Sequence, residues 1–102
     1  MASRLNLQTE LETILGSRNV YFQPPESVKM KYDAIRYSLG GKNLLHADDR
    51  IYRSNNRYYG VVITYDPDSK IPDAILEHFK MCSFGSPYTK DNLNHFPFTL
   101  YY

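Results

Sequence analysis

Apolar residues near the start of the chain recur at the spacing of one helix face. The positions i, i+4, i+7 and i+8 are occupied by Leu7, Leu11, Ile14 and Leu15. On a helix this spacing makes a single apolar stripe. Ser3 can cap the start, and Gly16 stands where a helix commonly ends. The pattern therefore predicts a helix over residues 3–15.

A second helical spacing lies in the later part of the chain. Three apolar residues are separated by four positions each: Ile71, Ile75 and Phe79. Pro72 fits the first turn of such a helix, where a missing N–H does no harm. Segment 66–69 supplies the preceding turn, in which Asp68 or Ser69 can act as the cap.

Alternating apolar and polar residues, or short β-prone runs, predict strands elsewhere. The segments concerned are 20–23, 31–39, 51–53, 57–65 and 96–102. Segment 57–65 is apolar on both faces, which predicts a central position in a sheet. Pro24 and Pro25 cannot lie inside a paired central strand, so segment 20–23 is expected at an edge. Gly60 marks either a bulge or a close backbone contact.

Residues that favour turns separate these segments. The predicted turns and loops are 40–41, 54–56 and 83–95, and segment 42–49 is predicted to be a loop or the tip of a hairpin. Glycine and asparagine are common there because they tolerate left-handed backbone angles. The resulting order of elements is α-β-β-β-β-α-β. We expect one α+β domain over residues 1–102, with a small, mostly antiparallel sheet and two helices packed on it.

Composition and charge mainly exclude classes of protein. The 102 residues carry a formal net charge of +1, which argues against a dedicated nucleic-acid binder. No apolar run is long enough to predict a membrane span, and the first ten residues lack the apolar core of a secretory signal. The single cysteine, Cys82, excludes an internal disulfide framework.

Tyrosine is unusually common. Aromatic residues make up 15% of the chain, with ten tyrosines and no tryptophan. A tyrosine ring has an apolar body and a polar tip, so it suits surfaces that are wet in one state and covered in another. The alternative is that a small sheet protein uses aromatic residues as strand formers.

Two groupings of residues could in principle carry chemistry. His46 lies close to Asp48 and Asp49, but no second cluster supplies the further ligands of a metal site. His78 and Cys82 stand four residues apart and could pair to activate a thiolate, but no third group orients them. Motifs for phosphate, dinucleotide or hydrolase sites are absent. We therefore expect no catalytic residue, no metal and no cofactor.

One stretch interleaves basic and aromatic side chains. Lys29, Lys31 and Arg36 alternate with Tyr32 and Tyr37, a pattern that can hold a single nucleic-acid strand by stacking and phosphate contact. The other interpretation is a strand with a polar face and core tyrosines. A small nucleic-acid-binding module therefore stays as an alternative function.

A series of short motifs runs from residue 19 to residue 102. They are Val20-Tyr21-Phe22-Gln23-Pro24-Pro25, Lys31-Tyr32-x-Ala34-Ile35-Arg36-Tyr37, Asn56-Arg57-Tyr58, Tyr65-Asp66-Pro67-Asp68-Ser69-x-Ile71-Pro72, Asp91-Asn92-Leu93-Asn94-His95 and Phe98-Thr99-Leu100-Tyr101-Tyr102. In order and spacing the series resembles a family of small proteins encoded in the head–tail joining region of long-tailed phages and prophages of Gram-positive bacteria. Its members are called minor capsid, tail completion or tail terminator proteins. The sequence departs from the family, which tends to have proline at Asp33 and a β-branched residue at Gly60.

The resemblance implies a structural role in the virion. Tail terminators form a ring, typically a hexamer of one chain, on the tail tube; the ring stops tube polymerisation and docks to the connector of the head. DNA passes through such a ring without being read. The resemblance implies no enzyme activity and no membrane, and a protein made in the bacterial cytoplasm and found in the virion neck. A head-completion (stopper) protein is the alternative within the virion.

Candidate interface residues follow from the predicted sheet edges. A closed ring needs two different complementary patches on each subunit, and exposed strand edges can supply backbone pairing across subunits. The expected interface residues are Tyr21, Phe22, Tyr52, Arg53 and Arg57. Segment 40–56, polar at its tip and rich in tyrosine and arginine, is expected to form one contact surface.

Overall fold

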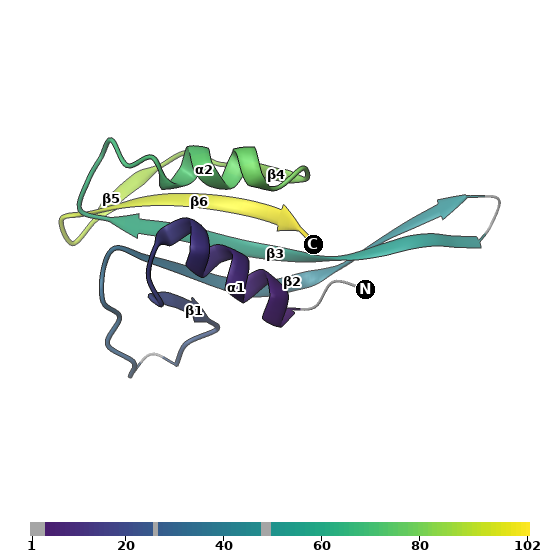
Figure 1. Ribbon diagram of the computed structural model, residues 1–102, viewed down its shortest axis with the longest axis horizontal. Coiled ribbons are helices and arrows are strands. Elements are labelled where there is room, and N and C mark those ends of the chain that lie inside the picture. Colours follow the sequence, from purple (N-terminus) through teal and green to yellow (C-terminus); the bar gives the residue numbers. More distant parts are fainter. Residues whose placement is uncertain (1–3, 26, 48–49) are drawn as a thin grey trace.

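The chain has an α+β fold with two helices and a mixed sheet, as the sequence predicts (Figure 1). The computed structural model describes residues 4–25, 27–47 and 50–102, and within residues 41–55 it describes the backbone alone. The elements are α1 (Arg4–Leu15), β1 (Val20–Phe22), β2 (Ala34–Ala47), β3 (Arg50–Thr64), α2 (Ile71–His78), β4 (Cys82–Phe84), β5 (Tyr88–Lys90) and β6 (Leu93–Tyr101).

The sheet has the order β1-β2-β3-β6-β4, and β5 also pairs with β6. The pairing is antiparallel throughout except for β1, which runs parallel to β2 at the sheet edge. The predicted edge position of segment 20–23 and the predicted central position of segment 57–65 are confirmed. β3 lies between β2 and β6; the helical layer covers one of its faces, and Val61 and Ile63 are buried on the other.

One face of the sheet carries the main core. Residues at alternate positions of β2, β3 and β6 point toward α1 and α2, as strand geometry requires. The buried side chains of this layer are Leu7, Leu11, Val20, Ile35, Tyr37, Tyr58, Val62, Ile75, Phe79, Phe98 and Leu100. Burying a large apolar side chain contributes about 1.5–3 kcal/mol, so this layer is the principal source of stability.

A polar contact fixes α1 on the sheet. Tyr37 is 1% exposed, and its hydroxyl donates a hydrogen bond to Gln8 Oε1 at 2.6 Å. Gln8 Nε2 donates in turn to the carbonyl of Val20 at 2.8 Å. A buried hydroxyl without a partner would cost about 1–3 kcal/mol, so these two hydrogen bonds favour one position of α1 on the sheet.

β2 and β3 form a single long hairpin. The sequence allowed a hairpin tip within segment 42–49, but it did not predict that both strands would be this long. The turns expected at Gly40–Gly41 and at residues 54–56 are wrong, because strand pairing runs through both, as far as Ala47 and Arg50. The register skips Gly40, which forms a bulge in β2. A bulge absorbs the extra residue without ending the strand, so cross-strand pairing overrides the local preference for a turn.

The segment expected to be an irregular loop, 83–95, is largely strand. It holds most of β4, all of β5 and the start of β6. Asp91 and Asn92 have φ values of 54° and 64° and connect Lys90 to its partner Leu93. Two successive residues with positive φ make the tight hairpin turn that matches strand twist, so Asp91-Asn92 was the signal that the sequence reading overlooked.

The two helices lie close to their predicted bounds. α1 ends at Leu15, as expected, and Gly16 follows it with a φ of 81°. Pro72 lies in the first turn of α2 as predicted. The expected side-chain cap is absent at the N-cap position, which is Lys70. Ser69, one residue before the N-cap, supplies a side-chain acceptor instead: its Oγ accepts a hydrogen bond from the Ile71 N–H at 3.2 Å.

Gly60 makes the close contact that the sequence allowed. It lies opposite Phe98 in the β3–β6 pairing, and the register is unbroken there. A Cβ placed on Gly60 would lie 2.2 Å from Phe98 Cζ. Phe98 is buried and its ring packs against Phe84 at 5.3 Å between centroids, so it has little room to move aside.

We predict that Gly60→Ala lowers the free energy of unfolding by about 1–3 kcal/mol, because it overpacks the core. Urea unfolding followed by tyrosine fluorescence measures the change. Gly85→Ala is the matched control, since a Cβ there would meet Pro97 at an ordinary 3.6 Å. The cost of Gly60→Ala should shrink in a Phe98→Leu background; an undiminished cost would mean that the phenylalanine ring is not the cause.

Candidate interface surfaces

The two predicted residues of β1 lie at the sheet edge and are half-buried. Phe22 packs against the core, with its ring 5.0 Å from that of Tyr37 and the guanidinium of Arg4 4.4 Å above it. The hydroxyl of Tyr21 accepts a hydrogen bond from the Lys31 backbone N–H at 3.0 Å. These side chains therefore support the strand from within, and what β1 offers a partner is its outer backbone edge.

Arg57 is the third predicted interface residue whose side chain the structure describes. It lies where the β2–β3 hairpin leaves the sheet. Its Nη2 donates to the carbonyl of Gly40 at 3.2 Å, and its guanidinium lies 5.4 Å from the ring centre of Tyr59. Its Nε is buried and, among the described residues, has no hydrogen-bond partner. The side chains of Tyr52 and Arg53 lie outside the described part of the structure.

The far half of the β2–β3 hairpin extends beyond the rest of the sheet (Figure 1). β1 pairs with β2 only as far as Tyr37, and β6 pairs with β3 only from Arg57 onward. We call the paired segments Gly41–Ala47 and Arg50–Asn56 the ribbon. Within the described residues no third strand pairs with it, and it accounts for a long dimension of 50 Å against 26 and 22 Å.

A hollow of about 450 Å³ lies on the sheet face away from the helices. Arg36, Tyr59 and Pro97 line it from three neighbouring strands, and Tyr88 closes one side. Arg36, Tyr59 and Pro97 alternate with the core residues of β2, β3 and β6, which places them on the opposite face. Tyr59 and Tyr88 are 47% and 49% exposed.

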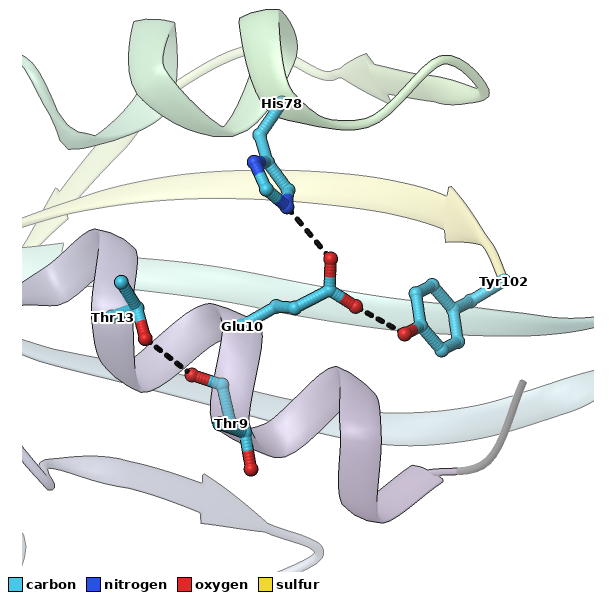
Figure 2. A network of polar contacts seen from close by, with 5 residues as sticks. All are labelled: Thr9, Glu10, Thr13, His78 and Tyr102. Atoms are coloured by element: carbon cyan, nitrogen blue, oxygen red, sulfur yellow. Dashed lines mark hydrogen bonds and ion pairs between the residues drawn. The ribbon is translucent and has the colours of Figure 1, made fainter.

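A network of polar contacts ties α1, α2 and the last residue together (Figure 2). Glu10 Oε1 lies 2.7 Å from His78 Nε2, and the hydroxyl of Tyr102 donates a hydrogen bond to Glu10 Oε2. The backbone N–H and carbonyl of Tyr102 both pair with Asn56. We call Glu10, His78 and Tyr102 the clamp. It closes the rim of the apolar layer on the side where the ribbon begins.

The clamp changes the acidity of two of its members. Burial alone would raise the pKa of Glu10, but the hydrogen bonds from Tyr102 and His78 outweigh it and hold that pKa below its usual 4.5. Burial and the hydrogen bond to Glu10 raise the pKa of Tyr102 to about 12. The clamp therefore makes its full contribution to stability between pH 4.5 and pH 10.0, the ordinary pKa values of glutamate and tyrosine.

The thiol of Cys82 is not activated. Burial raises its pKa to about 11, whereas a nucleophilic thiolate needs a pKa lowered by nearby positive charge. His78, its predicted partner, directs Nε2 to Glu10. The arrangement offers no support for thiol chemistry at this pair.

The basic and aromatic stretch does not present one continuous face. Tyr37 is buried against α1, while Arg36 points to the opposite side of the sheet. The ring of Tyr32 packs edge-on against Tyr65, with 6.1 Å between centroids. The tyrosines are thus committed to packing, and bases could not stack on them side by side.

Two further expectations concern metals and membranes. The side chains of His46, Asp48 and Asp49 lie outside the described residues, and the described ones contain no cluster of three or more potential metal-binding side chains. Neither helix in the described part of the chain is long and apolar enough to cross a membrane.

No family model matches the chain, and no curated protein matches its sequence.

Sequence reasoning missed both the clamp and the hollow. Glu10 and His78 are 68 residues apart, and Glu10 and Tyr102 are 92 apart, so no local pattern reports their contact. The one available signal was that Glu10 lies off the apolar stripe of α1. Tyr59 and Arg36 were correctly assigned to strands. They share a hollow because their strands, β3 and β2, are neighbours in the sheet, and the sequence alone does not give that order.

We predict that Glu10→Gln lowers the free energy of unfolding at neutral pH by about 0.2–1 kcal/mol, the range for a partly exposed pair. The pKa of Glu10 is lowered on folding, so its contribution is present above pH 4.5 and is lost as pH falls further. The difference between variant and wild type should therefore vanish in acid. Chemical unfolding across the pH range measures it.

Tyr102→Phe is the control for this experiment. It keeps the ring, which lies 6.1 Å from that of Phe79, and removes the hydroxyl. The pKa of Tyr102 is raised on folding, so the wild type should lose more stability than the variant as pH rises from 10.0 toward 12. Burial also raises the pKa of Tyr37, but that contribution is common to both proteins. A Glu10→Gln protein as stable as the wild type at neutral pH would contradict the role given to the clamp.

Proposed function

We propose that this chain is a structural protein of the phage head–tail junction, a tail terminator that forms a ring on the tail tube. In this role it ends tube polymerisation and docks to the head connector. The observation that carries the proposal, together with the ordered motifs noted above, is the ribbon. It projects from the sheet, and apart from the backbone pairing of Asn56 with Tyr102 at its base, both of its strand edges are free within the described residues.

The ribbon is better suited to assembly than to an isolated subunit. A two-stranded ribbon on its own is marginally stable in water, and a free strand edge invites pairing with another chain. At roughly 3.3 Å per residue, its seven paired positions on β2 reach about 20 Å beyond the sheet. That reach is comparable with the 22 and 26 Å widths of one subunit, so a neighbour placed beside it in a ring would cover the ribbon.

The charge of the chain is compatible with a passage for DNA. A net charge of +1 gives weak attraction for phosphate, and strong phosphate binding would hinder DNA from passing. The absence of an activated nucleophile at Cys82 fits a chain that works by contact. A stopper protein below the portal would share these properties, so the experiment must separate the two roles.

We predict that a phage carrying a nonsense mutation in this reading frame makes separate heads and tails. A tail terminator stops tube growth, so its loss should give tails of uncontrolled length and heads filled with DNA. Electron microscopy of infected-cell lysates measures both. Tails of normal length beside heads that have lost their DNA would instead identify a stopper, and normal infectious particles would overturn the proposal.

We predict that the double reversal Arg53→Glu and Arg57→Glu reproduces this defect when supplied to the nonsense mutant. These arginines lie on the ribbon and at its base, so reversing them should block contact with a neighbour. The matched control is Lys29→Glu with Lys90→Glu, which changes net charge equally at two exposed positions. Thermal unfolding of each purified variant checks the fold. Normal tails from a folded double variant would remove these arginines from the interface.

A further inference from the structure

The two faces of the sheet are covered unequally. Both helices lie on one face, over the main core. On the other face a smaller cluster, Val61, Ile63 and Leu93 with Met30 and Tyr32 against it, covers one end. Beyond that cluster lies the hollow lined by Arg36, Tyr59, Tyr88 and Pro97. Aromatic and arginine side chains around an open depression are typical of the energetic centre of a protein interface.

The walls of the hollow are held in place before any partner arrives. The ring of Tyr88 stacks on His95, with 4.8 Å between centroids and planes 14° apart. The ring of Tyr59 lies beneath the guanidinium of Arg57, and the neighbouring Gly40 leaves it room, since a Cβ there would meet the ring at 2.5 Å. Side chains fixed in this way lose little conformational freedom on binding.

The hollow is positively charged. Arg36 is exposed and forms no ion pair among the described residues, and no described lining residue is acidic. Arg57 adds a second cation beside Tyr59. A partner for this surface should therefore present an apolar side chain flanked by carboxylates.

The outer side of α2 has that chemistry. Leu76 is 44% exposed, and Asp73 and Glu77 beside it are exposed and form no ion pair among the described residues. Lys70 and Lys80 lie just outside the ends of the helix and limit the acidic patch. Glu77 also lies near the end of the helix, where its charge is unfavourable to the helix dipole, so it does not serve the helix itself.

α1 does not offer an equal surface. Both of its carboxylates are occupied, since Glu10 belongs to the clamp and Glu12 accepts a hydrogen bond from Gln8 at 3.0 Å. Its exposed apolar residue, Leu5, is 66% exposed and follows the cation Arg4. A cationic hollow would therefore prefer α2.

We propose that the hollow of one subunit receives the outer side of α2, centred on Leu76, from the neighbouring copy of this chain. The inference rests on the proposed ring and names two of its contact surfaces. Leu76 enters between the two tyrosine rings, while Asp73 and Glu77 meet Arg36 and Arg57. The two surfaces lie on opposite faces of the sheet. This arrangement suits a head-to-tail ring, in which each subunit presents a different patch to each neighbour.

A charge swap tests the pairing of opposite charges in the purified full-length chain. Arg36→Glu and Glu77→Lys should each raise the dissociation constant of self-association about tenfold or more, because like charges then face each other. The chain carrying both changes should recover. Sedimentation velocity over a concentration series measures association, with Arg18→Glu, an exposed reversal outside both surfaces, as the control.

A disulfide test reports the contact directly. In a Cys82→Ser background, Leu76→Cys with Tyr88→Cys should give a ladder of linked chains under oxidation. The two positions lie on opposite faces of one subunit, so they cannot be bridged within it. Leu5→Cys with Tyr88→Cys is the control and should stay unlinked.

Each result has a definite consequence. Recovery in the charge swap and linkage in the disulfide test support the inference. It is overturned if the chain remains monomeric at millimolar concentration without linkage, if the swap does not recover, or if the Leu5 pair links as well as the Leu76 pair. Rings that form regardless of Arg36 and Glu77 would refute this contact and leave the proposed function, which is judged by tail length in the phage, untouched.

Discussion

The burial of one apolar layer between two helices and a single face of β2, β3 and β6 is the constraint on which the rest of the structure depends. A chain of 102 residues has apolar side chains enough for one such layer, and it places both helices there. The other face is left covered at one end only. The open hollow and the projecting ribbon are both consequences, since no element remains to cover them within the described residues.

Polar contacts give this layer a single arrangement. Gln8 joins Tyr37 to Val20 and fixes α1 over β1 and β2. Glu10 joins α1 to α2 and to the end of β6 through His78 and Tyr102. Hydrogen bonds of this kind add modest net stability, but an alternative packing would leave them unmade. The helical layer is therefore rigid enough to present a defined outer surface.

Local patterns in the sequence were sufficient to predict the fold class and the helices and strands that bury one of their faces in the core. The stripe of α1, the spacing of α2 and the apolar faces of segment 57–65 each reflect a period that the core imposes. Gly40, Gly41 and Asn55 led to wrong predictions of turns, because the preference of these residues for turns is weaker than the stabilisation gained by pairing with the facing strand. The clamp and the hollow depend on which distant segments meet, and Glu10 and Tyr102 are 92 residues apart.

The bulge at Gly40 lies where the ribbon leaves the sheet. A bulge bends its strand and increases the local twist, so Gly40 sets the direction in which the ribbon starts; a second register shift follows within it, between Leu45 and His46. The ribbon then acts as a lever arm about 20 Å long. A rotation of about 5° at its pivot would displace the far end by almost 2 Å, so the place that the far end reaches depends on backbone geometry at a glycine.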